Sequence, residues 1–483
     1  MASVSLYLPN SKLYFENGVA AHPNSSLSFK SMLPGYKRKR LSVRDRGTRP
    51  KPVHISNSIA APSHTFDVVI IGAGIIGLTI ARQFLLGSDL SVAVVDKHVP
   101  CSGATGAGQG YIWMVHMTPD SDLWYLTMRS HKLWEMLAES LRDQGLNPLQ
   151  LLGWKKTGSL LVGRTPEESV MLHRRVEQLS EAGLRADYLS SDDLLLKEPE
   201  LMVGRESGAA FLPDDCQIDA QRTVAYIEEA NRNFAVEGRY AEFYNDPATC
   251  LLRSGSSGEI EGIQTSRNTL YSKKAVVVAA GCWSGSLMHE LVKESNIALD
   301  VPVKPRKGHL LVIENFNYLH LNHGLMEVGY VDHLEALHPT DSALGMDDHA
   351  QTLSVSMTAT VDSAGNLVLG SSRQFTGFNA EINELVVDRI WKRAGDFFPK
   401  LKELSLTDLR KSRKVRVGLR PYMPDGKPVI GPVPGLSNLY LATGHEGGGL
   451  SMALGTAEMV ADMVMGNTGN ADYATFAVQG RCC

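Results

Sequence analysis

The sequence is poor in cysteine and has no long apolar run. Its six cysteines among 483 residues are scattered without the CxxC or Cys/His spacing that zinc sites need. We therefore expect neither a metal site nor a disulfide framework. No apolar stretch reaches the roughly 18 residues that cross a bilayer, so we expect no membrane span. Hydrophobic residues still make up 43% of the chain, which suffices for sizeable cores, and the length favours two domains over one.

Acidic residues are scarce in the first 64 residues, which hold ten Lys or Arg against two acids, Glu16 and Asp45. The rest of the chain holds 38 basic and 50 acidic residues, and an acidic body argues against nucleic acid as a partner. The leading segment is rich in serine and lacks the apolar core of a secretory signal. We interpret residues 1–64 as a disordered transit peptide for the chloroplast or, as the alternative, the mitochondrion. A disordered basic tail with another role is the competing interpretation.

Order is expected to begin at Phe66 with a βαβ unit. Residues 66–71 form a near-continuous β-branched run, which is typical of a buried parallel strand. A glycine turn over residues 72–77 follows, then a helical stretch over 78–86 and a second strand over 92–95. This order of elements predicts a dinucleotide site, with these contact residues in the turn: Gly72, Gly74, Ile75, Ile76 and Gly77.

The turn has the chemistry that a pyrophosphate needs, because glycines let backbone N–H groups approach it and a helix N-terminus faces its charge. Asp96 ends the second strand, 19 residues after Gly77, where a carboxylate accepts hydrogen bonds from ribose hydroxyls. A cap of a helix or loop is the other interpretation of Asp96. Its negative charge disfavours a 2′-phosphate and hence NADP, but the turn alone leaves FAD and NAD open.

The middle of the chain has weaker patterns. Apolar residues at helical spacing predict a long amphipathic helix over residues 120–141, preceded by capping candidates at 119–122. Short strands are expected over 158–163, 208–212 and 365–369, between turn residues. With a loop-like stretch over 333–351, these strands suggest a second, sheet-rich domain inserted into the nucleotide-binding fold.

Four further segments carry a resemblance to a known family. They are residues 102–105 (Ser-Gly-Ala-Thr) with 109–111 (Gln-Gly-Tyr), the strand and turn over 275–284, the run Gly-Leu-Arg-Pro-Tyr-Met-Pro-Asp-Gly-Lys-Pro-Val-Ile-Gly over 418–431, and the terminal strand, glycine turn and helix start over 439–450. In order and spacing they resemble the D-amino-acid oxidase, glycine oxidase and sarcosine oxidase family of flavoenzymes, over about residues 66–466. Shorter similarities lie at residues 305–309 and 369–373.

The resemblance implies an α/β fold, with a Rossmann-like FAD-binding domain and an interleaved antiparallel-sheet substrate domain. We place the discontinuous FAD-binding domain at residues 65–145, 206–304 and 405–470, and the substrate domain at 146–205 and 305–404. The resemblance also decides for FAD over NAD. Beyond the turn, it implies these cofactor contacts: Asp96, Lys97, Ala104, Thr105, Gln109, Gly110, Tyr111, Ala280, Gly281, Trp283, Gly444, His445, Gly447, Gly448, Gly449 and Leu450.

The resemblance also implies an amine or amino-acid substrate, whose carbon bearing nitrogen gives a hydride to the flavin. Arg420 matches the family's arginine that holds a substrate carboxylate, a task suited to a planar guanidinium fork. A purely structural salt bridge is the rival role of Arg420. His445 is interpreted either as a general base or as a structural contact of the flavin. The residue positions near Arg420 offer no thiol for a covalent link, so non-covalent FAD is expected.

One position departs from the family. Some glycine oxidases carry a second arginine after the Gly-His pair, whereas this chain has Gly447, preceded by Glu446. This difference weakens glycine as the substrate. A Glu446 that faced the pocket would favour a cationic or secondary amine.

Three functions remain open from the sequence. The first is an oxidase of amines or amino acids that uses oxygen as the electron acceptor. The second is a dehydrogenase that passes electrons to a carrier, and the third is a non-catalytic assembly factor that retains FAD.

Overall fold

The structure is a computed structural model that describes residues 61–255, 258–293, 297, 299–331, 353–467 and 473–482. These residues belong to one compact unit, Ala61–Cys483. Residues 1–60 of the expected transit peptide and the expected loop over 333–351 lie outside the described residues.

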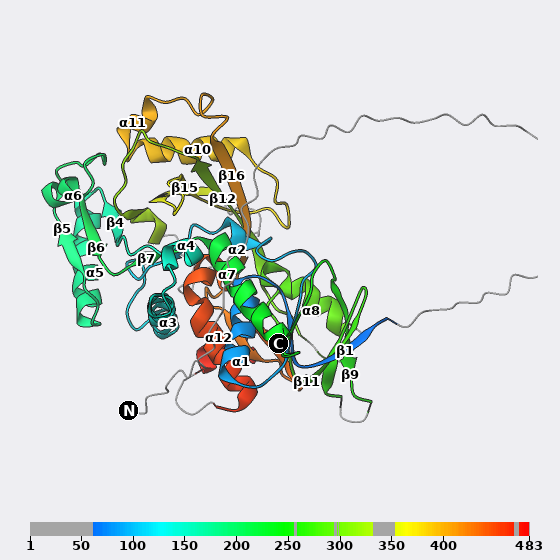
Figure 1. The fold of residues 1–483 in the computed structure, drawn as a ribbon. Coiled ribbons are helices and arrows are strands. Elements are labelled where there is room, and N and C mark those ends of the chain that lie inside the picture. The colour runs from blue at the N-terminus through cyan, green and yellow to red at the C-terminus, as the bar shows by residue number, and fades with distance from the viewer. Residues whose placement is uncertain are drawn as a thin grey trace, which may run out of the picture. The chain divides into compact units, whose positions relative to one another are not determined.

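The first sheet has the parallel core of a nucleotide-binding fold (Figure 1). β1 pairs in parallel with β2 and β11, and these pair in turn with β8 and β18. The strands in spatial order are β17 (Val429–Pro432), β18 (Leu439–Thr443), β11 (Thr269–Val278), β1 (Ser63–Ile71), β2 (Val92–Val95) and β8 (Tyr240–Phe243), with β10 (Ile260–Thr265) and β9 (Ala248–Arg253) attached to β11. The β-branched residues of β1 are buried on both faces, as the sequence predicted.

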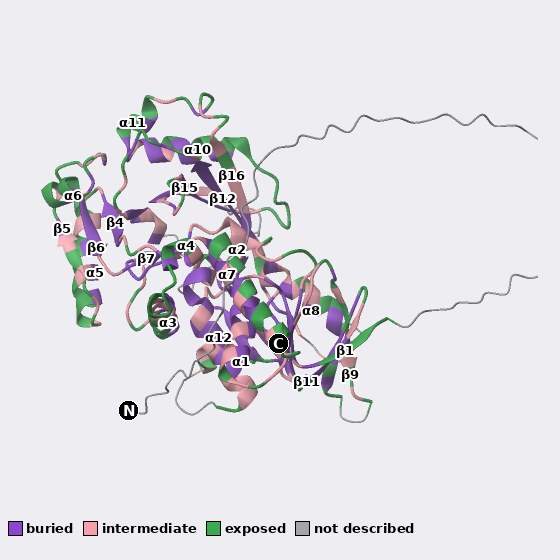
Figure 2. Ribbon diagram, viewed as in Figure 1, coloured by how far each residue is buried: buried purple, intermediate pink, exposed green. Residues whose placement is uncertain are grey.

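Helices cover both faces of this sheet. Val68 and Ile70 of β1 pack in a core with α1 (Ile75–Gly87), α3 (Trp124–Asp143), α7 (Ala220–Arg232) and α12 (Gly449–Met465). The alternate residues Val69 and Ile71 pack toward α8 (Ser284–Val292), because successive side chains of a strand point to opposite faces. Figure 2 shows the buried stripes along α1 and α12 and the exposed outer face of α7.

The second sheet is antiparallel except where β13 pairs in parallel with β4. Its strands in spatial order are β16 (Arg413–Tyr422), β12 (Lys304–Ile313), β15 (Leu367–Phe375), β14 (Ser354–Val361), β13 (Gly324–Glu327), β4 (Ser159–Gly163), β6 (Gly208–Leu212) and β5 (Asp187–Leu189). A core on one face includes α6 (Ser191–Lys197), α10 (Glu384–Gly395) and α11 (Pro399–Lys402), and a core on the other includes α5 (Pro166–Glu181).

The remaining elements are short. They are α2 (Ala104–Ala107), α4 (Pro148–Leu152), the two-stranded pair of β3 (Tyr111–Ile112) and β7 (Cys216–Gln217), and the 3-10 helices η1 (Asn233–Ala235), η2 (Gly281–Trp283), η3 (Glu446–Gly448) and η4 (Ala474–Phe476). None of the helices within the described ranges has the length and apolarity that a membrane crossing requires.

The expected fold class, α/β with a second sheet, is confirmed, whereas several boundaries differ. The predicted helix over 120–141 begins only at Trp124, because Asp120 adopts a left-handed conformation with φ of 59°, which a helix does not tolerate. The capping residues expected at 119–122 do not cap it, since its N-cap position is Leu123. The strand expected at 365–369 begins at Leu367 because Gly365 lies in a turn with φ of 82°.

Two strands that lie within the ranges expected for the FAD-binding domain belong to the second sheet. β6 and β16 lie in the ranges 206–304 and 405–470 that we assigned to the FAD-binding domain, yet both pair within the second sheet. The physical reason is that β16 hydrogen-bonds along the whole length of β12, a partner distant in sequence.

Candidate functional site

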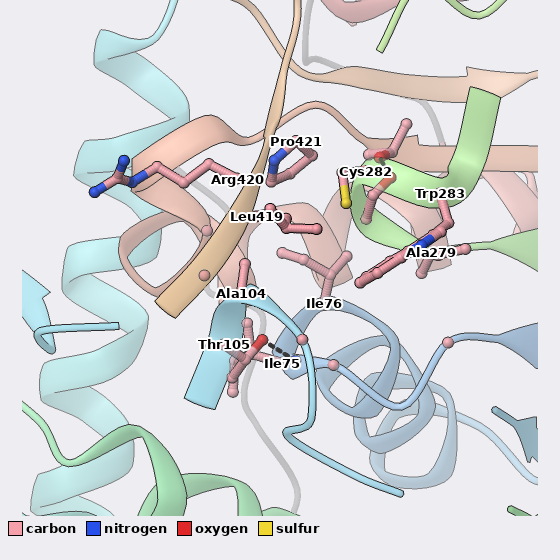
Figure 3. Close-up of a pocket in the computed structure, with 18 of the residues that line it drawn as sticks. Ile75, Ile76, Ala104, Thr105, Ala279, Cys282, Trp283, Leu419, Arg420 and Pro421 are labelled. Atoms are coloured by element: carbon pink, nitrogen blue, oxygen red, sulfur yellow. Dashed lines mark hydrogen bonds between the residues drawn. The ribbon is translucent and has the colours of Figure 1, made fainter. Parts of the chain in front are cut away.

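A cavity of about 600 Å³ runs from the carboxyl ends of β1 and β2 to the strands β12 and β16. Such an edge of a parallel sheet is where ligands bind in doubly wound folds. Figure 3 shows Ile75, Ile76, Ala104 and Thr105 on one side of this cavity, with Trp283 and Arg420 at opposite sides of the view.

The glycine turn forms the floor of the cavity as predicted. α1 begins at Ile75 after Gly74, and the N-cap residue Gly74 has no side chain with which to cap the helix. Gly77 does not line the cavity but packs the helix against the turn, because a Cβ there would lie 1.9 Å from the carbonyl oxygen of Gly72. The turn therefore leaves a helix N-terminus with its positive dipole end toward the cavity.

Two side chains fix the shape of this turn. The carboxylate of Asp96 accepts hydrogen bonds from the backbone N–H groups of Ala73 and His98, both at 2.7 Å. The Thr105 hydroxyl accepts a bond of 3.2 Å from the N–H of Ile75 (Figure 3). Asp96 lines the cavity, and its oxygens keep lone pairs for a ligand hydroxyl.

Lys97 and Trp283 form one end of the cavity. The ammonium group of Lys97 lies 4.0 Å from the centre of the Trp283 ring, a cation–π contact. Burial lowers the pKa of Lys97. Cys282, beside Trp283, also lines the cavity, and burial raises the pKa of its thiol to about 12.

The glycine-rich segment before α12 forms another wall. Gly447, Gly449 and Leu450 line the cavity together with His445. Burial lowers the pKa of His445 to about 3, and its Nε2 lies 2.9 Å from the hydroxyl oxygen of Thr456. His445 is therefore held as a neutral ring whose one hydrogen bond among the described residues ties it to α12.

Arg420 lies at the end of the cavity away from Trp283. Its guanidinium lies over Gly308 of β12, where a Cβ would come within 2.3 Å of Nη1. Within the part of the chain that the structure describes, its one hydrogen bond runs from Nη1 to the carbonyl oxygen of Ser372, at 3.0 Å. The remaining donors of the fork are available to a ligand.

Glu446 also lines the cavity, close to Arg420. Its carboxylate lies 3.3 Å from Nη1 of Arg306. Burial alone would raise the pKa of Glu446, but the positive charges of Arg420, Arg306 and Arg373 outweigh burial and lower it. Glu446 is therefore an ionised group that an arginine already neutralises.

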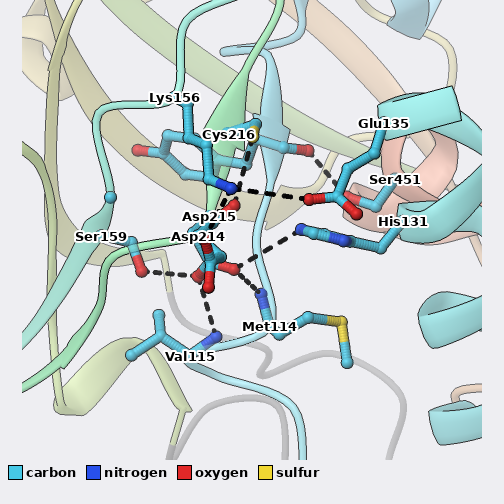
Figure 4. A network of polar contacts seen from close by, with 12 residues as sticks. Met114, Val115, His131, Glu135, Lys156, Ser159, Asp214, Asp215, Cys216 and Ser451 are labelled. Atoms are coloured by element: carbon cyan, nitrogen blue, oxygen red, sulfur yellow. Dashed lines mark hydrogen bonds and ion pairs between the residues drawn. The ribbon is translucent and has the colours of Figure 1, made fainter. Parts of the chain in front are cut away.

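A buried polar network holds the wall that carries Tyr111 (Figure 4). Asp215 accepts hydrogen bonds from the N–H groups of Met114 and Val115, at 2.8 and 3.1 Å, and from the Ser159 hydroxyl at 2.6 Å. The hydroxyl of Ser451 in α12 donates to the carbonyl oxygen of Tyr111 at 2.7 Å. These bonds connect the β3 segment to both sheets.

The ionisable groups of this network are strongly affected by burial. Burial raises the pKa of Asp215 to about 7, and it lowers the pKa of His131, whose Nε2 lies 3.9 Å from that carboxylate. Figure 4 shows the two side chains facing one another.

The structure brings nearly all of the predicted contact residues to one cavity. The predicted residues that line it are Gly72, Gly74, Ile75, Ile76, Asp96, Lys97, Ala104, Thr105, Gln109, Gly110, Tyr111, Ala280, Gly281, Trp283, Arg420, His445, Gly447, Gly449 and Leu450. Gly77, Gly444 and Gly448 are not among the lining residues. Gly444 serves the turn, with φ of 83°, and a Cβ there would lie 2.5 Å from Met423.

Sequence reasoning missed Tyr330, Thr358 and Ser371, which line the cavity from the second sheet and the turn after β13. No local motif marks them, because they come from separate strands. The alternation of side chains along β14 and β15 is the signal that would have selected Thr358 and Ser371 for one face.

The residues present fit an adenine dinucleotide with a flavin. A helix N-terminus whose N-cap residue is a glycine suits the pyrophosphate, and Asp96 suits a ribose. Tyr111, a predicted flavin contact, also lines the cavity among the described residues. Within the same residues no cluster of His, Cys, Asp and Glu has the arrangement of a metal site.

Comparisons with known proteins agree with this geometry. The family described as FAD dependent oxidoreductase matches residues 67–463. The chain is 25% identical to glycine oxidase from Geobacillus kaustophilus, over 86% of this chain and 97% of that protein. It is 23% identical to hydrogen cyanide synthase subunit HcnC from Pseudomonas protegens, over 79% of this chain and 88% of that one.

Solved structures share the fold. The structure of glycine oxidase from Geobacillus kaustophilus aligns with a TM-score of 0.68 at 23% identity, covering 86% of this chain and 99% of that one. L-proline dehydrogenase from P. horikoshii aligns with a TM-score of 0.68 at 20% identity, covering 86% and 97%.

Proposed function

This chain belongs to the FAD dependent oxidoreductase family, and on that premise we propose that it oxidises an amine or amino acid. FAD, when bound, supplies the chemistry, because it accepts the hydride that leaves the carbon bearing nitrogen. The residues of the chain bind both partners, orient them and provide the electrostatic environment. Relatives with glycine oxidase in their names support a small amino-acid substrate.

The observation that carries the proposal is Arg420. It lies at the end of the cavity away from Lys97 and Trp283, and its guanidinium has donors that no other described residue uses. A carboxylate binds such a fork through two parallel hydrogen bonds, which fixes the neighbouring carbon in position as well as holding the charge. No ion-pair partner of Arg420 lies within 4.0 Å among the described residues, which favours ligand binding over a structural salt bridge.

His445 does not have the properties of a general base in this proposal. Its ring is buried, its pKa is lowered to about 3, and it is hydrogen-bonded to Thr456. We assign it to positioning the glycine-rich segment. The sequence left this choice open, and the contact with α12 favours the structural role.

FAD is bound non-covalently in this proposal. The thiols that line the cavity are those of Cys101 and Cys282, and burial raises the pKa of each to about 12. A protonated thiol is a poor nucleophile, so neither side chain favours a covalent link to the flavin. Acid precipitation is expected to release the flavin into the supernatant.

Glycine itself is disfavoured as the substrate. Gly447 stands where some glycine oxidases carry a second arginine, and Glu446 beside it is already paired with Arg306. This pairing also withdraws support from the hypothesis that Glu446 selects a cationic amine. If Glu446→Gln leaves the substrate preference unchanged, that hypothesis is wrong.

The test of the proposed function is anaerobic reduction of the bound flavin. The purified protein is mixed with single amino acids and amines without oxygen, and the visible band of oxidised flavin is followed. Bleaching by one class identifies a substrate, and recolouring in air separates an oxidase from a dehydrogenase that needs a carrier. A flavin that no amine bleaches would support the non-catalytic assembly factor instead.

We propose further that residues 1–64 direct the protein to the chloroplast. The support is compositional, since this segment is basic, rich in serine and poor in acids. The segment fused to a fluorescent protein should accumulate in plastids of leaf protoplasts. Accumulation in mitochondria would select the alternative organelle, and a cytosolic signal would contradict both.

A further inference from the structure

Three arginines stand on one face of the second sheet, at the end of the cavity. The register places Arg306 of β12 directly opposite Arg420 of β16 and opposite Phe375 of β15. Arg373 precedes Phe375 by two residues, so its side chain leaves the strand on the same face. Like charges directly opposite one another on neighbouring strands are destabilising unless an anion joins them.

One carboxylate lies among these three guanidinium groups. Glu446 forms its ion pair with Arg306, at 3.3 Å. Arg420 is assigned above to the carboxylate of the substrate, and it contributes to the field that lowers the pKa of Glu446. The one negative charge of Glu446 offsets one of the three arginine charges, so two positive charges remain for a ligand.

Arg306 pairs with Glu446 and Arg420 is assigned to the substrate, whereas Arg373 has neither role. Its side chain is buried, with the residue 3% exposed. Over the described ranges it has no hydrogen bond and no ion pair, and its Nη2 is a buried donor without a partner. Its guanidinium lies over the ring of Tyr330, with the central carbon 4.0 Å from the ring centre.

A buried charge in this state is costly. Removing an ionised group from water is unfavourable unless hydrogen bonds and an opposite charge compensate for it. The cation–π contact with Tyr330 compensates for only a small part of this cost. An anion supplied by a ligand would compensate for the rest.

The neighbouring wall of the cavity has the matching donors. Tyr330 lines the cavity and contacts Arg373, which does not itself line it. Ser371, on the same strand as Arg373, lines the cavity directly. The hydroxyl of Ser371 is buried without a partner among the described residues. Hydroxyls can donate to a carboxylate, so this wall provides hydrogen bonds in front of the charge of Arg373.

We propose that the substrate is an amine with two carboxylates, of which Arg420 holds one and the wall in front of Arg373 holds the other. This inference rests on the proposed function, because it adds a second anionic group to the amine that the enzyme oxidises. Arg373 is a specificity-determining residue in this arrangement, and it acts through its charge.

The test compares amines that differ in one carboxylate. Glutamate, aspartate and iminodiacetate are compared with alanine, glycine and sarcosine by stopped-flow reduction of the FAD-loaded protein. The dicarboxylic amines should show values of kcat/KM at least tenfold higher. Arg373→Met should lower kcat/KM for the dicarboxylic amines by about 10- to 100-fold, because it removes the positive charge behind the site of the second carboxylate. It should leave the values for the monocarboxylic amines unchanged.

The matched control is Arg413→Gln, which removes an arginine at the start of β16 that pairs with Glu384. It should not change the ratio between the two substrate classes. Because Arg373 is buried and unpaired in the described structure, Arg373→Met should unfold at the same temperature as the wild type or higher. A lower unfolding temperature, with both substrate classes weakened alike, would overturn the proposal and indicate a structural role.

A ligand without an amine separates this inference from the proposed function. Glutarate has two carboxylates and no nitrogen, so its binding needs no turnover. It should shift the visible spectrum of the bound flavin, with a Kd about tenfold or more weaker in Arg373→Met. If no amine bleaches the flavin but glutarate binds in this way, the proposed function fails while the second anion site stands. Absence of both the shift and the dicarboxylate preference would overturn the inference.

Discussion

At the scale of single residues, the chemistry of the cavity depends on how many hydrogen-bond donors of a cationic side chain remain for a ligand. Arg420 uses one donor for the carbonyl oxygen of Ser372, and its guanidinium rests on Gly308. A side chain at position 308 would displace the fork, so these two residues act together. The position of Arg420 opposite Arg306 follows from strand pairing, and no local sequence motif encodes it.

Exchange of Arg420 for Lys should keep the charge and remove the planar fork. We expect kcat/KM for the best amine substrate to fall about 10- to 100-fold, since one of two charged hydrogen bonds is lost. Steady-state and stopped-flow kinetics with Arg413→Lys as the control measure this effect. An unchanged kcat/KM would assign Arg420 to structure.

At the scale of elements, the first turn of α1 depends on close contact between helix and strand. The Cβ that Gly77→Ala adds would lie 1.9 Å from the carbonyl oxygen of Gly72, so the turn must open. Overpacking of this kind costs about 1–3 kcal/mol. We expect a lower unfolding temperature and a purified protein with little flavin.

The same helix supplies the control for this prediction. Gly87, its last residue, has no atom within 4 Å of an added Cβ. Gly87→Ala should be neutral or raise the stability by up to about 1 kcal/mol, because alanine restricts the unfolded chain. The measurements are thermal unfolding and the ratio of flavin to protein absorbance. Equal flavin content in the two variants would show that the turn does not bind the cofactor.

The segment of β3 depends on a carboxyl group whose pKa is raised by burial. The pKa of Asp215 is raised to about 7, whereas the same group in the unfolded chain loses its proton near pH 4. The native state therefore binds more protons between about pH 4 and pH 7, and stability contributed by this group falls as pH rises through that window. The slope for one proton is at most about 1.4 kcal/mol per pH unit.

Exchange of Asp215 for Asn should flatten the dependence of unfolding temperature on pH in this window. Asn keeps the shape and one acceptor oxygen but has no proton to lose. Thermal unfolding at intervals between pH 4.5 and pH 8 gives the slope for each protein. Equal slopes in wild type and variant would assign the pH dependence to other groups.

At the scale of the whole molecule, the sequence predicts what local chemistry encodes. The β-branched run before Gly72, the turn and Asp96 follow one another within one βαβ unit, and each constrains the next, so this unit and its cavity contacts were predicted closely. The strand predicted over residues 208–212 has the bounds of β6, because turn residues flank it on both sides.

The second sheet was predicted less well because its pairing is remote in sequence. β16 follows segments assigned to the FAD-binding domain, yet its hydrogen bonds go to β12. The proximity of Arg306, Arg373 and Glu446 has the same cause, since it needs two strands and a 3-10 helix to come together. No periodicity within any one of these segments marks this cluster.

The arrangement of the cavity predicts that FAD stabilises both sheets together. The first sheet supplies the glycine turn and Asp96, and the second supplies Gly308, Arg420 and Ser371. A ligand that binds only the native state, at a concentration of 100 times its Kd, adds about 2.7 kcal/mol to the free energy of unfolding.

Apoprotein prepared by removal of flavin should therefore unfold several degrees lower. Added FAD should raise the temperature of a single cooperative transition. Calorimetry with and without FAD measures this. A second transition that FAD leaves unmoved would mean that the two sheets unfold independently.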